Sequence, residues 1–398
     1  MCDAELPGLT DRLQTAGLVW TDPVAVLPRG ITDRDPRAGD EVFRFVTGRR
    51  PVTEAVFATA AQHQPGVAVR RGVQVTELIT GPSAVPGLPH IAGVRTSGGE
   101  DLRGDLVIDA MGRRSRASEL LAELGAAAHE QAEDSGFGYY TRFFSGPALP
   151  ALMAPPLMPL GTISLLTLPG DNDTWSVTVF GASGDAPLKQ LRDADCFTRV
   201  VRACPLQAHW LDGDPITGVL AMAGIMDRYR RFAADGGPIV TGFAAVGDAW
   251  ACTNPSAGRG LSVGLVHSQL LRHTVRDHLG DPAALARAFD EGTEREVAPF
   301  YWSQVAADRA RITQMTALRE NRTWSPPVSP MTGLVNGASH DADLFRAMIE
   351  ALTCLAPTQE VLERPDLQDK LDRWSREPVP EPPGPDRQQL LSLLSAPA

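Results

Sequence analysis

The sequence predicts an α/β protein of the mixed (α+β) kind, and three observations support this prediction. Apolar and β-branched residues over 239–246 indicate a buried strand, which a loop of small residues joins to an amphipathic helix from residue 261. Three strand-like segments between residues 136 and 181 follow one another without a helix, which is typical of an antiparallel sheet. Helical periodicity dominates residues 282–374. We therefore expect a lobe that combines buried strands with helices, an inserted antiparallel β-sheet lobe and a helical C-terminal part.

The composition limits the classes of protein to which the chain can belong. With 398 residues it exceeds one typical hydrophobic core, so we expect two lobes. A net charge of −11 argues against nucleic acid or an anionic membrane as a partner. Prolines interrupt the longest uncharged segment, residues 143–170, so we expect no membrane span there.

The cysteines and the first residues bear on location and on metals. The five cysteines are odd in number and mostly far apart, which favours a reducing compartment over a disulfide framework. The acidic first residues lack the apolar segment of a signal peptide, so we expect a cytoplasmic protein. No cluster of Cys and His has metal-ligand spacing, and we expect no metal site.

The first part of the chain alternates helical and strand-like patterns. Pro51 and Glu54 form a helix-start signal directly after Arg49-Arg50. Gly98-Gly99 indicates a tight turn, and Gly112 ends a short buried strand. The expected elements are helices over residues 9–16, from 52 and over 118–124, and strands over 73–79, 91–96 and 105–109.

The rest of the chain changes from strands to helices. We expect strands over residues 136–145, 161–168 and 174–181, and then a helix over 188–204. Further helices are predicted over residues 261–279, 282–296, 303–319, 341–353 and 359–374. The proline-rich run after Arg376 favours an extended and flexible tail.

Residues 238–279 carry the clearest functional signal. Asp248 follows the predicted strand directly, so its carboxylate lies beyond the strand's carboxyl end, where ligands bind in open α/β sheets. The glycines of the next loop let a ligand approach the backbone closely. The turn at Gly258–Leu261 leads into the helix, and the free backbone N–H groups of a helix start favour negative charge.

The spaced residues Gly247-Asp248-Ala249, Pro255, Gly258 and Gly260-Leu261 resemble the second flavin motif of the FAD-dependent monooxygenases, the superfamily of p-hydroxybenzoate hydroxylase. The resemblance implies FAD as the cofactor, with Asp248 on the ribityl chain and Pro255 beside the isoalloxazine ring. It also implies that an Arg at the start of a helix contacts the flavin side, and Arg50 is our candidate; a solvated Arg at a helix start is the alternative. The backbone expected at the N1/O2 edge of the ring belongs to Gly258, Arg259, Gly260 and Leu261.

Two departures from this family qualify the resemblance. Family members open with a strand and a Gly-x-Gly-x-x-Gly turn, and no such fingerprint occurs near Met1. We therefore expect an incomplete FAD/NAD(P)-binding Rossmann-like lobe that lacks its N-terminal βαβ unit and binds FAD weakly. Met111 occupies a position where the family has Asp, between the flavin pyrophosphate and the nicotinamide cofactor. This predicts that a separate flavin reductase, rather than bound NAD(P)H, supplies the electrons.

The predicted parts of the chain follow from these patterns. Residues 1–126 and 238–280 are expected to form the FAD-binding lobe, and residues 127–237 a β-rich substrate lobe. Residues 281–375 are expected to form the helical region, and residues 376–398 the flexible tail.

The resemblance implies an FAD-dependent oxidoreductase, a monooxygenase that hydroxylates or epoxidises an apolar small molecule or a polyketide-type secondary metabolite. Because the flavin carries the chemistry, we assign no catalytic side chain, and we interpret His209 and His267 as structural. One alternative is a flavin-dependent halogenase, which needs a Lys and a Trp-x-Trp-x-Ile-Pro segment; the segment is absent and the two lysines, Lys189 and Lys370, lie elsewhere. The other alternative is a non-catalytic remnant without the N-terminal unit.

Overall fold

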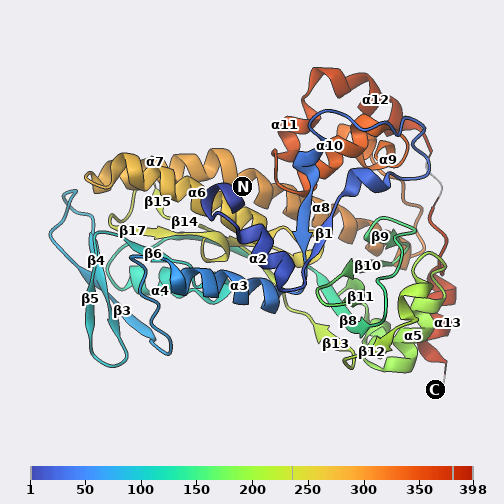
Figure 1. Cartoon of the computed structure of the whole chain (residues 1–398), viewed down its shortest axis with the longest axis horizontal. Helices are drawn as coiled ribbons and strands as arrows, with labels where there is room; N and C mark the ends of the chain where they lie inside the picture. The colour runs from blue at the N-terminus through green and yellow to red at the C-terminus, as the bar shows by residue number, and fades with distance from the viewer. Residues whose placement is uncertain (1, 235, 379–380, 397–398) are drawn as a thin grey trace.

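The computed structural model describes residues 2–234, 236–378 and 381–396. The chain is elongated, with a strand-and-helix lobe at one end and an antiparallel sheet lobe at the other (Figure 1). Helices α9 (Pro330–Gly337) to α12 (Gln368–Arg376) lie above the sheet lobe in this view, and the N-terminal segment crosses between the two ends. The predicted fold class, which combines helices with separate sheets and a helical C-terminal part, is therefore confirmed.

Two short parallel strands organise the first lobe. β6 (Val107–Asp109) pairs with β17 (Phe243–Ala245), and Asp109 lies opposite Ala245. Both strands therefore end at the same edge, where the turns η3 (Gly112–Arg114) and η6 (Gly247–Ala249) follow. No other strand within the described residues pairs with either of them.

The strand predicted over 239–246 is shorter than expected because of Gly242. This glycine has φ +69°, and a Cβ there would lie 2.1 Å from the carbonyl oxygen of Ile91. The close approach bends the chain just before β17, and Thr241 forms an isolated parallel bridge with His90 instead. Glycine is needed here because other residues disfavour this backbone conformation.

Helices cover both sides of these strands (Figure 1). Phe289 and Leu271 from the helices on one side pack against Ala244 and Val246 around β17. A three-stranded antiparallel sheet closes the far end. The elements of this lobe are α1 (Cys2–Glu5), α2 (Leu9–Thr15), α3 (Arg50–His63), α4 (Ala117–Ala122), α6 (Gly260–His278), α7 (Pro282–Gly292), β3 (Val75–Thr80), β4 (Ile91–Thr96) and β5 (Asp101–Arg103).

Strands that sequence patterns did not predict connect the two lobes. β7 (His129–Asp134), β14 (Met226–Arg231) and β18 (Ala251–Cys252) form an antiparallel sheet beside the η6 turn. Both ends of the predicted substrate lobe, residues 127–237, thus belong to this connecting sheet. Two smaller antiparallel sheets each contain two strands: β1 (Val19–Thr21) with β2 (Phe45–Thr47), and β15 (Ala233–Ala234) with β16 (Gly237–Pro238).

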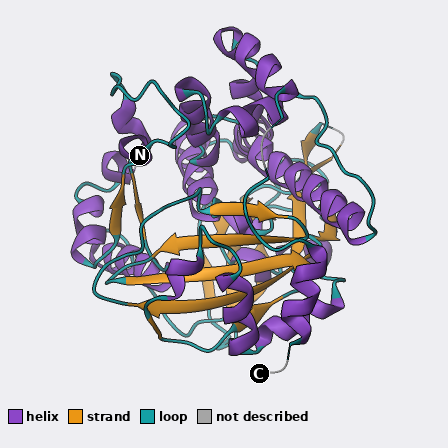
Figure 2. Ribbon diagram, turned by 90° about the vertical axis from the view of Figure 1, so that its right-hand side faces the viewer, coloured by secondary structure: helices purple, strands orange, loops and turns teal. Residues whose placement is uncertain are grey.

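The second lobe is a six-stranded antiparallel sheet, as its consecutive strand-like segments predicted (Figure 2). Side chains alternate between its faces. Val177, Val179 and Leu165 point to one face, where α5 (Ala194–Arg202) and α13 (Arg387–Ser395) complete a hydrophobic core. Tyr139 and Phe180 point to the other face, toward Met315 of α8 (Ala298–Arg319). The strands are β8 (Phe137–Ser145), β9 (Leu157–Leu160), β10 (Ile163–Pro169), β11 (Thr174–Ala182), β12 (Asp214–Pro215) and β13 (Leu220–Met222).

Two predicted helices are divided in the structure. The helix expected over 188–204 is a 3₁₀ segment followed by α5, because the Asp193 side chain caps α5 by accepting N–H groups of Asp195 and Cys196. The helix expected over 359–374 is α11 (Thr358–Leu362) and α12 (Gln368–Arg376), since Pro365 cannot continue a helix. The remaining C-terminal helices are α9 (Pro330–Gly337) and α10 (Ala342–Leu352).

The predicted flexible tail over 376–398 differs from the structure. Residues 387–395 form α13, which begins with a capping box at Asp386. Arg387 donates to both oxygens of the buried Asp185 at 2.6 and 2.8 Å, and Leu390 is 1% exposed. The proline-rich run is thus followed by a helix that packs against the sheet lobe.

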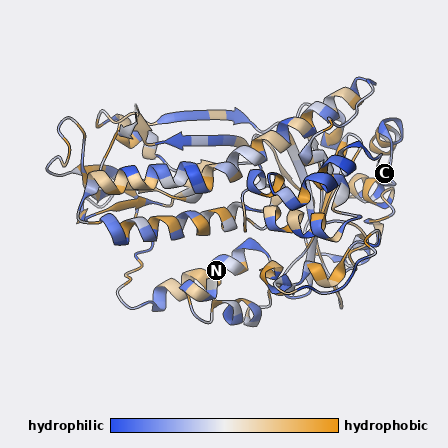
Figure 3. Cartoon of the chain, turned by 90° about the horizontal axis from the view of Figure 1, so that it is seen from above, coloured by the Kyte–Doolittle hydropathy of each residue, from blue (hydrophilic) through white to orange (hydrophobic). Residues whose placement is uncertain are grey.

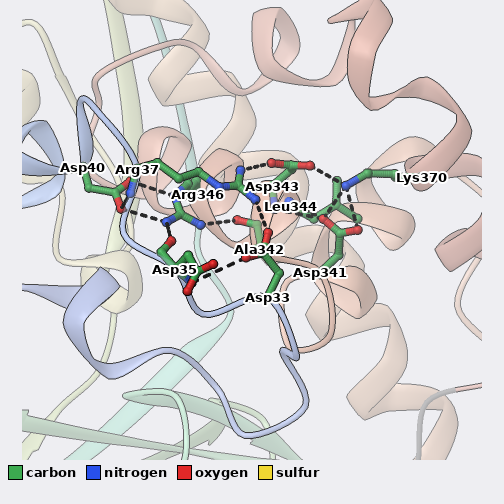
Figure 4. A network of polar contacts seen from close by, with 10 residues as sticks. All are labelled: Asp33, Asp35, Arg37, Asp40, Asp341, Ala342, Asp343, Leu344, Arg346 and Lys370. Atoms are coloured by element: carbon green, nitrogen blue, oxygen red, sulfur yellow. Dashed lines mark hydrogen bonds and ion pairs between the residues drawn. The ribbon is translucent and has the colours of Figure 1, made fainter.

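The N-terminal segment 22–44 binds the C-terminal helices through charged groups (Figure 4). Arg346 of α10 donates to both oxygens of Asp40 at 2.7 Å, and this pair is largely buried. Arg37 lies between Asp33 and Asp343, which Lys370 also contacts. These contacts fix the crossing segment above the sheet lobe.

The helices carry both hydrophilic and hydrophobic residues along their length (Figure 3). Of the helices within the described ranges, none combines the length and the apolar character that crossing a membrane requires.

Candidate cofactor site

Asp248 lies where the two parallel strands end. It belongs to η6, and its carboxylate is half-buried without a hydrogen bond or ion pair to any described residue. A Cβ added to Gly260 would lie 3.8 Å from Asp248 Oδ1, so the start of α6 is close to this carboxylate. Burial raises the pKa of Asp248, while the charges of Arg50 and Arg113 oppose that shift. A half-buried acceptor without a protein partner is suited to a ligand that donates hydrogen bonds.

The start of α6 offers donors beside this acceptor. Gly258 has φ +67°, and the next residue, Arg259, occupies the N-cap position without a side-chain cap. The first-turn N–H groups of α6 therefore remain open to a ligand. Gly260 and Leu261, the first two residues of the helix, are both exposed.

His267 stabilises the turn that contains Asp248. Its Nδ1 accepts the Gly247 N–H at 3.2 Å, and its Nε2–H donates to Thr293 Oγ1 at 3.0 Å. Thr293 in turn donates its hydroxyl to the Phe289 carbonyl, so the imidazole is neutral. Burial lowers the pKa of His267 to about 4, in accord with this assignment. The structural role predicted for His267 is confirmed, and it includes positioning the turn before Asp248.

Arg230 joins the two turns at the strand ends. This side chain is only 2% exposed. It donates to the Ala249 carbonyl at 2.7 Å, to the Ser115 carbonyl at 3.4 Å and to Glu130 at 3.0 Å. A single buried guanidinium thereby connects the segments after β6 and after β17. Sequence reasoning missed Arg230, because its partners lie far away in the chain.

The carboxylate of Asp109, at the end of β6, accepts hydrogen bonds from groups of the protein itself. It accepts the Met111 N–H at 2.8 Å and the Ser115 hydroxyl, which shapes the turn. The Met111 side chain itself is 74% exposed. Asp109 and Asp248 therefore lie at the same edge of the two strands, but the Asp109 carboxylate has partners within the protein, whereas that of Asp248 has none among the described residues.

The predicted Arg50 lies at the first position of α3. Its guanidinium is exposed and pairs with Glu54 at 2.5 Å, and its charge is close enough to lower the pKa of Asp248. The neighbouring Arg49 instead binds the buried Asp171, with its Nη2 at 2.7 Å and its backbone N–H at 2.8 Å. Arg49 thus fixes the start of α3, and Arg50 is exposed there with Glu54 as its partner.

One side of the loop between Asp248 and α6 is exposed to solvent, and the other side is buried. Pro255 and Gly258 are exposed, whereas Asn254 and Ser256 are buried. The Arg259 side chain also points inward, where it donates to Gln304 Oε1 at 3.0 Å and to the Phe300 carbonyl at 3.3 Å. Only the backbone of Arg259 is therefore placed to contact a ligand, as the resemblance implied.

One face of the sheet in the second lobe contacts this loop. The Tyr139 hydroxyl donates to Asn254, and the Tyr139 ring stacks on Phe180 with centroids 4.8 Å apart. Thr141 and Thr178 share a hydrogen bond of 2.8 Å farther along the same face. The partly exposed apolar residues of this face are Phe143, Leu166, Leu168, Leu220 and Met222.

Solved structures are similar to this chain, although no sequence match is found. No protein-family model matches the chain, and no curated protein matches it in sequence. Among solved structures, PqsL, a probable FAD-dependent monooxygenase from Pseudomonas aeruginosa, has TM-score 0.59 and 17% identity over 78% of this chain and 83% of its own. The flavin-dependent brominase Bmp2 has TM-score 0.56 and 15% identity over 93% of this chain and 86% of its own.

The anhydrotetracycline hydroxylase OxyS from Streptomyces rimosus is also similar, with TM-score 0.51 and 16% identity over 88% of this chain and 65% of its own. PqsL and Bmp2 are flavin enzymes by their descriptions, OxyS is described as a hydroxylase, and the similarity with each covers most of this chain. The chain therefore has the fold of the FAD-dependent monooxygenases.

Proposed function

We propose that this chain is an FAD-dependent oxidoreductase that acts as a monooxygenase, hydroxylating or epoxidising an apolar small molecule or a polyketide-type metabolite. The observation that carries the proposal is the unpartnered carboxylate of Asp248 beside the uncapped start of α6. This pair offers an acceptor for hydroxyl groups and donors for an electron-rich ring edge, which are the two requirements of a flavin.

The residues present fit the cofactor. Asp248 would accept hydrogen bonds from the ribityl chain, and the exposed Pro255 would pack beside the isoalloxazine ring. The backbone of Gly258, Arg259, Gly260 and Leu261 would face the N1/O2 edge, and Arg50 would lie on the flavin side. FAD, when bound, supplies the redox and oxygen chemistry, and the protein orients it.

The part of this sheet face that α8 leaves exposed supports an apolar substrate. Tyr139 is bound to Asn254, and the polar side chains in the middle of the face include the hydroxyls of Thr141 and Thr178. Phe143 and Leu166 supply apolar area on the same face. Such a face would bind a ring system by apolar contact and orient it through hydroxyl groups.

Replacing Asp248 with Ala is expected to weaken FAD binding by about 10- to 100-fold, because one charge-assisted hydrogen bond contributes about 1.5–3 kcal/mol. Titration of flavin fluorescence with the purified variant measures the dissociation constant. Asp277→Ala is the control, since Asp277 is exposed on α6 away from the site. An Asp248→Ala variant that is folded and binds FAD like the wild type would contradict the proposal.

A flavin-dependent halogenase is the second candidate, which the similarity to the brominase Bmp2 favours. The lysine that such an enzyme needs has no suitable position here. Lys370 on α12 is held by Asp341 at 2.9 Å, and Lys189 is exposed on the 3₁₀ segment Ala186–Arg192 at the α5 face of the sheet. We therefore rank the monooxygenase first.

We also propose that a separate flavin reductase supplies the electrons in the cytoplasm. The exposed Met111, where the resembling family has Asp, supports this. NADPH added without oxygen is expected to leave the absorbance of bound FAD unchanged, whereas NADPH with a flavin reductase is expected to bleach it. Rapid bleaching by NADPH alone would disprove the proposal.

A further inference from the structure

A buried network of polar side chains lies on the inner side of the loop, residues 254–259. Asn254 is its centre: it accepts from the Tyr139 hydroxyl, and its backbone N–H donates to Asp227 at 2.8 Å. Its side-chain Nδ2 donates to Asp308 at 2.9 Å and to Ser256 at 3.3 Å. The loop whose outer side faces the proposed flavin is therefore held by hydrogen bonds on its inner side.

Asp308 on α8 is the least satisfied member of this network. It is 5% exposed, and its Oδ1 accepts from Asn254 Nδ2 and from Gln304 Nε2, each at 2.9 Å. Its Oδ2 is buried and accepts from no described residue. Asp308 also forms no ion pair with a described cation, although Arg311 lies one turn farther along the same helix. A buried carboxylate oxygen without a donor disfavours the charged form.

Gln304 connects Asp308 to the far end of the loop. Its Nε2 donates to Ser256 at 3.2 Å as well as to Asp308, and its Oε1 accepts from Arg259 at 3.0 Å. Asp308 is thus bound to residue 254 directly and to residues 256 and 259 through one amide. A change in the charge of Asp308 acts on the whole loop.

We propose that Asp308 is the positioning residue of the flavin-facing loop, and that the loop holds FAD firmly only while the Asp308 carboxyl is neutral. This inference rests on the proposed function, because it assigns the outer side of the loop to FAD.

The charges around Asp308 support this assignment. The titratable groups that face it are Asp227 from β14, Tyr139 from β8 and Arg259 before α6. Burial, opposed by the Asn254 and Gln304 hydrogen bonds, raises the pKa of Asp308 to about 7. Above that pH the ionised carboxylate needs a donor for Oδ2 and repels the nearby Asp227, so it disturbs the hydrogen bonds that shape the loop.

The experiment is a titration of FAD binding across pH with the full chain and three variants. If only the neutral form binds, the dissociation constant of the wild type rises about tenfold between about pH 6 and about pH 8. Asp308→Asn keeps an acceptor at Oδ1 and carries no charge, so it is expected to bind as the wild type does at the lower pH, without a pH dependence. Asp308→Ala removes the acceptor and is expected to bind weakly throughout.

Asp227→Asn makes the same chemical change at a second buried carboxyl of the network, and it is expected to keep the pH dependence with a midpoint at lower pH, because it removes a negative charge beside Asp308. A slope that persists in Asp308→Asn, or that disappears in Asp227→Asn, overturns the inference. If the wild-type chain binds FAD with the same dissociation constant throughout this pH range, only the inference about Asp308 is overturned, and the proposed function stands. A wild-type chain that binds no FAD at any pH refutes the proposed function and this inference together.

Discussion

Replacing Arg230 with Met is expected to lower the free energy of unfolding by about 3–5 kcal/mol, because each of two backbone carbonyls that loses its donor costs about 1–3 kcal/mol and one ion pair is lost as well. Met keeps the length and apolar stem of the side chain, but it removes one of the donors to Glu130 and leaves the carbonyls of Ala249 and Ser115 without the donor that Arg230 supplies. Because these carbonyls belong to the two turns at the strand ends, FAD affinity should fall as well. Urea unfolding followed by tryptophan fluorescence, with and without FAD, measures both effects.

Arg228→Met is the control for this prediction. Arg228 lies on the same strand and pairs with the same Glu130 at 3.2 Å, but its side chain is 28% exposed. A more exposed pair contributes about 0–1 kcal/mol, so this variant should unfold close to the wild type. Equal losses in the two variants would show that Arg230 has no special role in joining the turns.

Replacing Leu390 with Ala is expected to destabilise the sheet lobe by about 2–5 kcal/mol, the usual cost of such a truncation in a packed core. Leu390 is 1% exposed and lies in one core with Phe197 and Val200 of α5 and with Val177 of the sheet. Urea unfolding again measures the loss.

Leu391→Ala makes the same change one residue along, where the side chain is 37% exposed, and it should have little effect. If the two variants were equally stable, α13 would not contribute to the core of the sheet lobe. A difference of the expected size would show that a segment beyond the proline-rich run is part of that core.

The predicted parts of the fold are those whose signal is local in the sequence. The strand before Asp248, the turn and the start of α6 follow one another within a few residues, so periodicity and glycine placement were enough to predict them. The antiparallel sheet that contains β8, β10 and β11 was predicted from local patterns too, since these strand-like segments follow one another without a helix between them. The break before α5 had a local signal too, because Asp193 is a strong N-cap residue.

The parts that could not be predicted depend on distant residues. Arg230 contacts Glu130 and Ser115, each at least 100 positions away, and no pattern around Arg230 indicates a buried guanidinium. No role was predicted for Asp308, because in the sequence it is one acidic residue within a helical segment. Its burial against Asn254 depends on the fold. Helix α13 follows a proline-rich run whose amino-acid composition favours disorder. The contact between Arg387 and Asp185, which lie far apart in the sequence, could not be predicted from that composition.

The contacts between the crossing segment and α10 have a consequence for the order in which the chain is made. Asp40 and Arg346 are 306 positions apart, so Asp40 leaves the ribosome long before its partner exists. At about 5–20 residues per second, the wait is roughly 15–60 s. During this interval residues 22–44 are an unpaired, charged stretch beside a nascent lobe. We therefore expect the crossing segment to be protease-sensitive on stalled ribosomes and to become protected only after α10 has emerged.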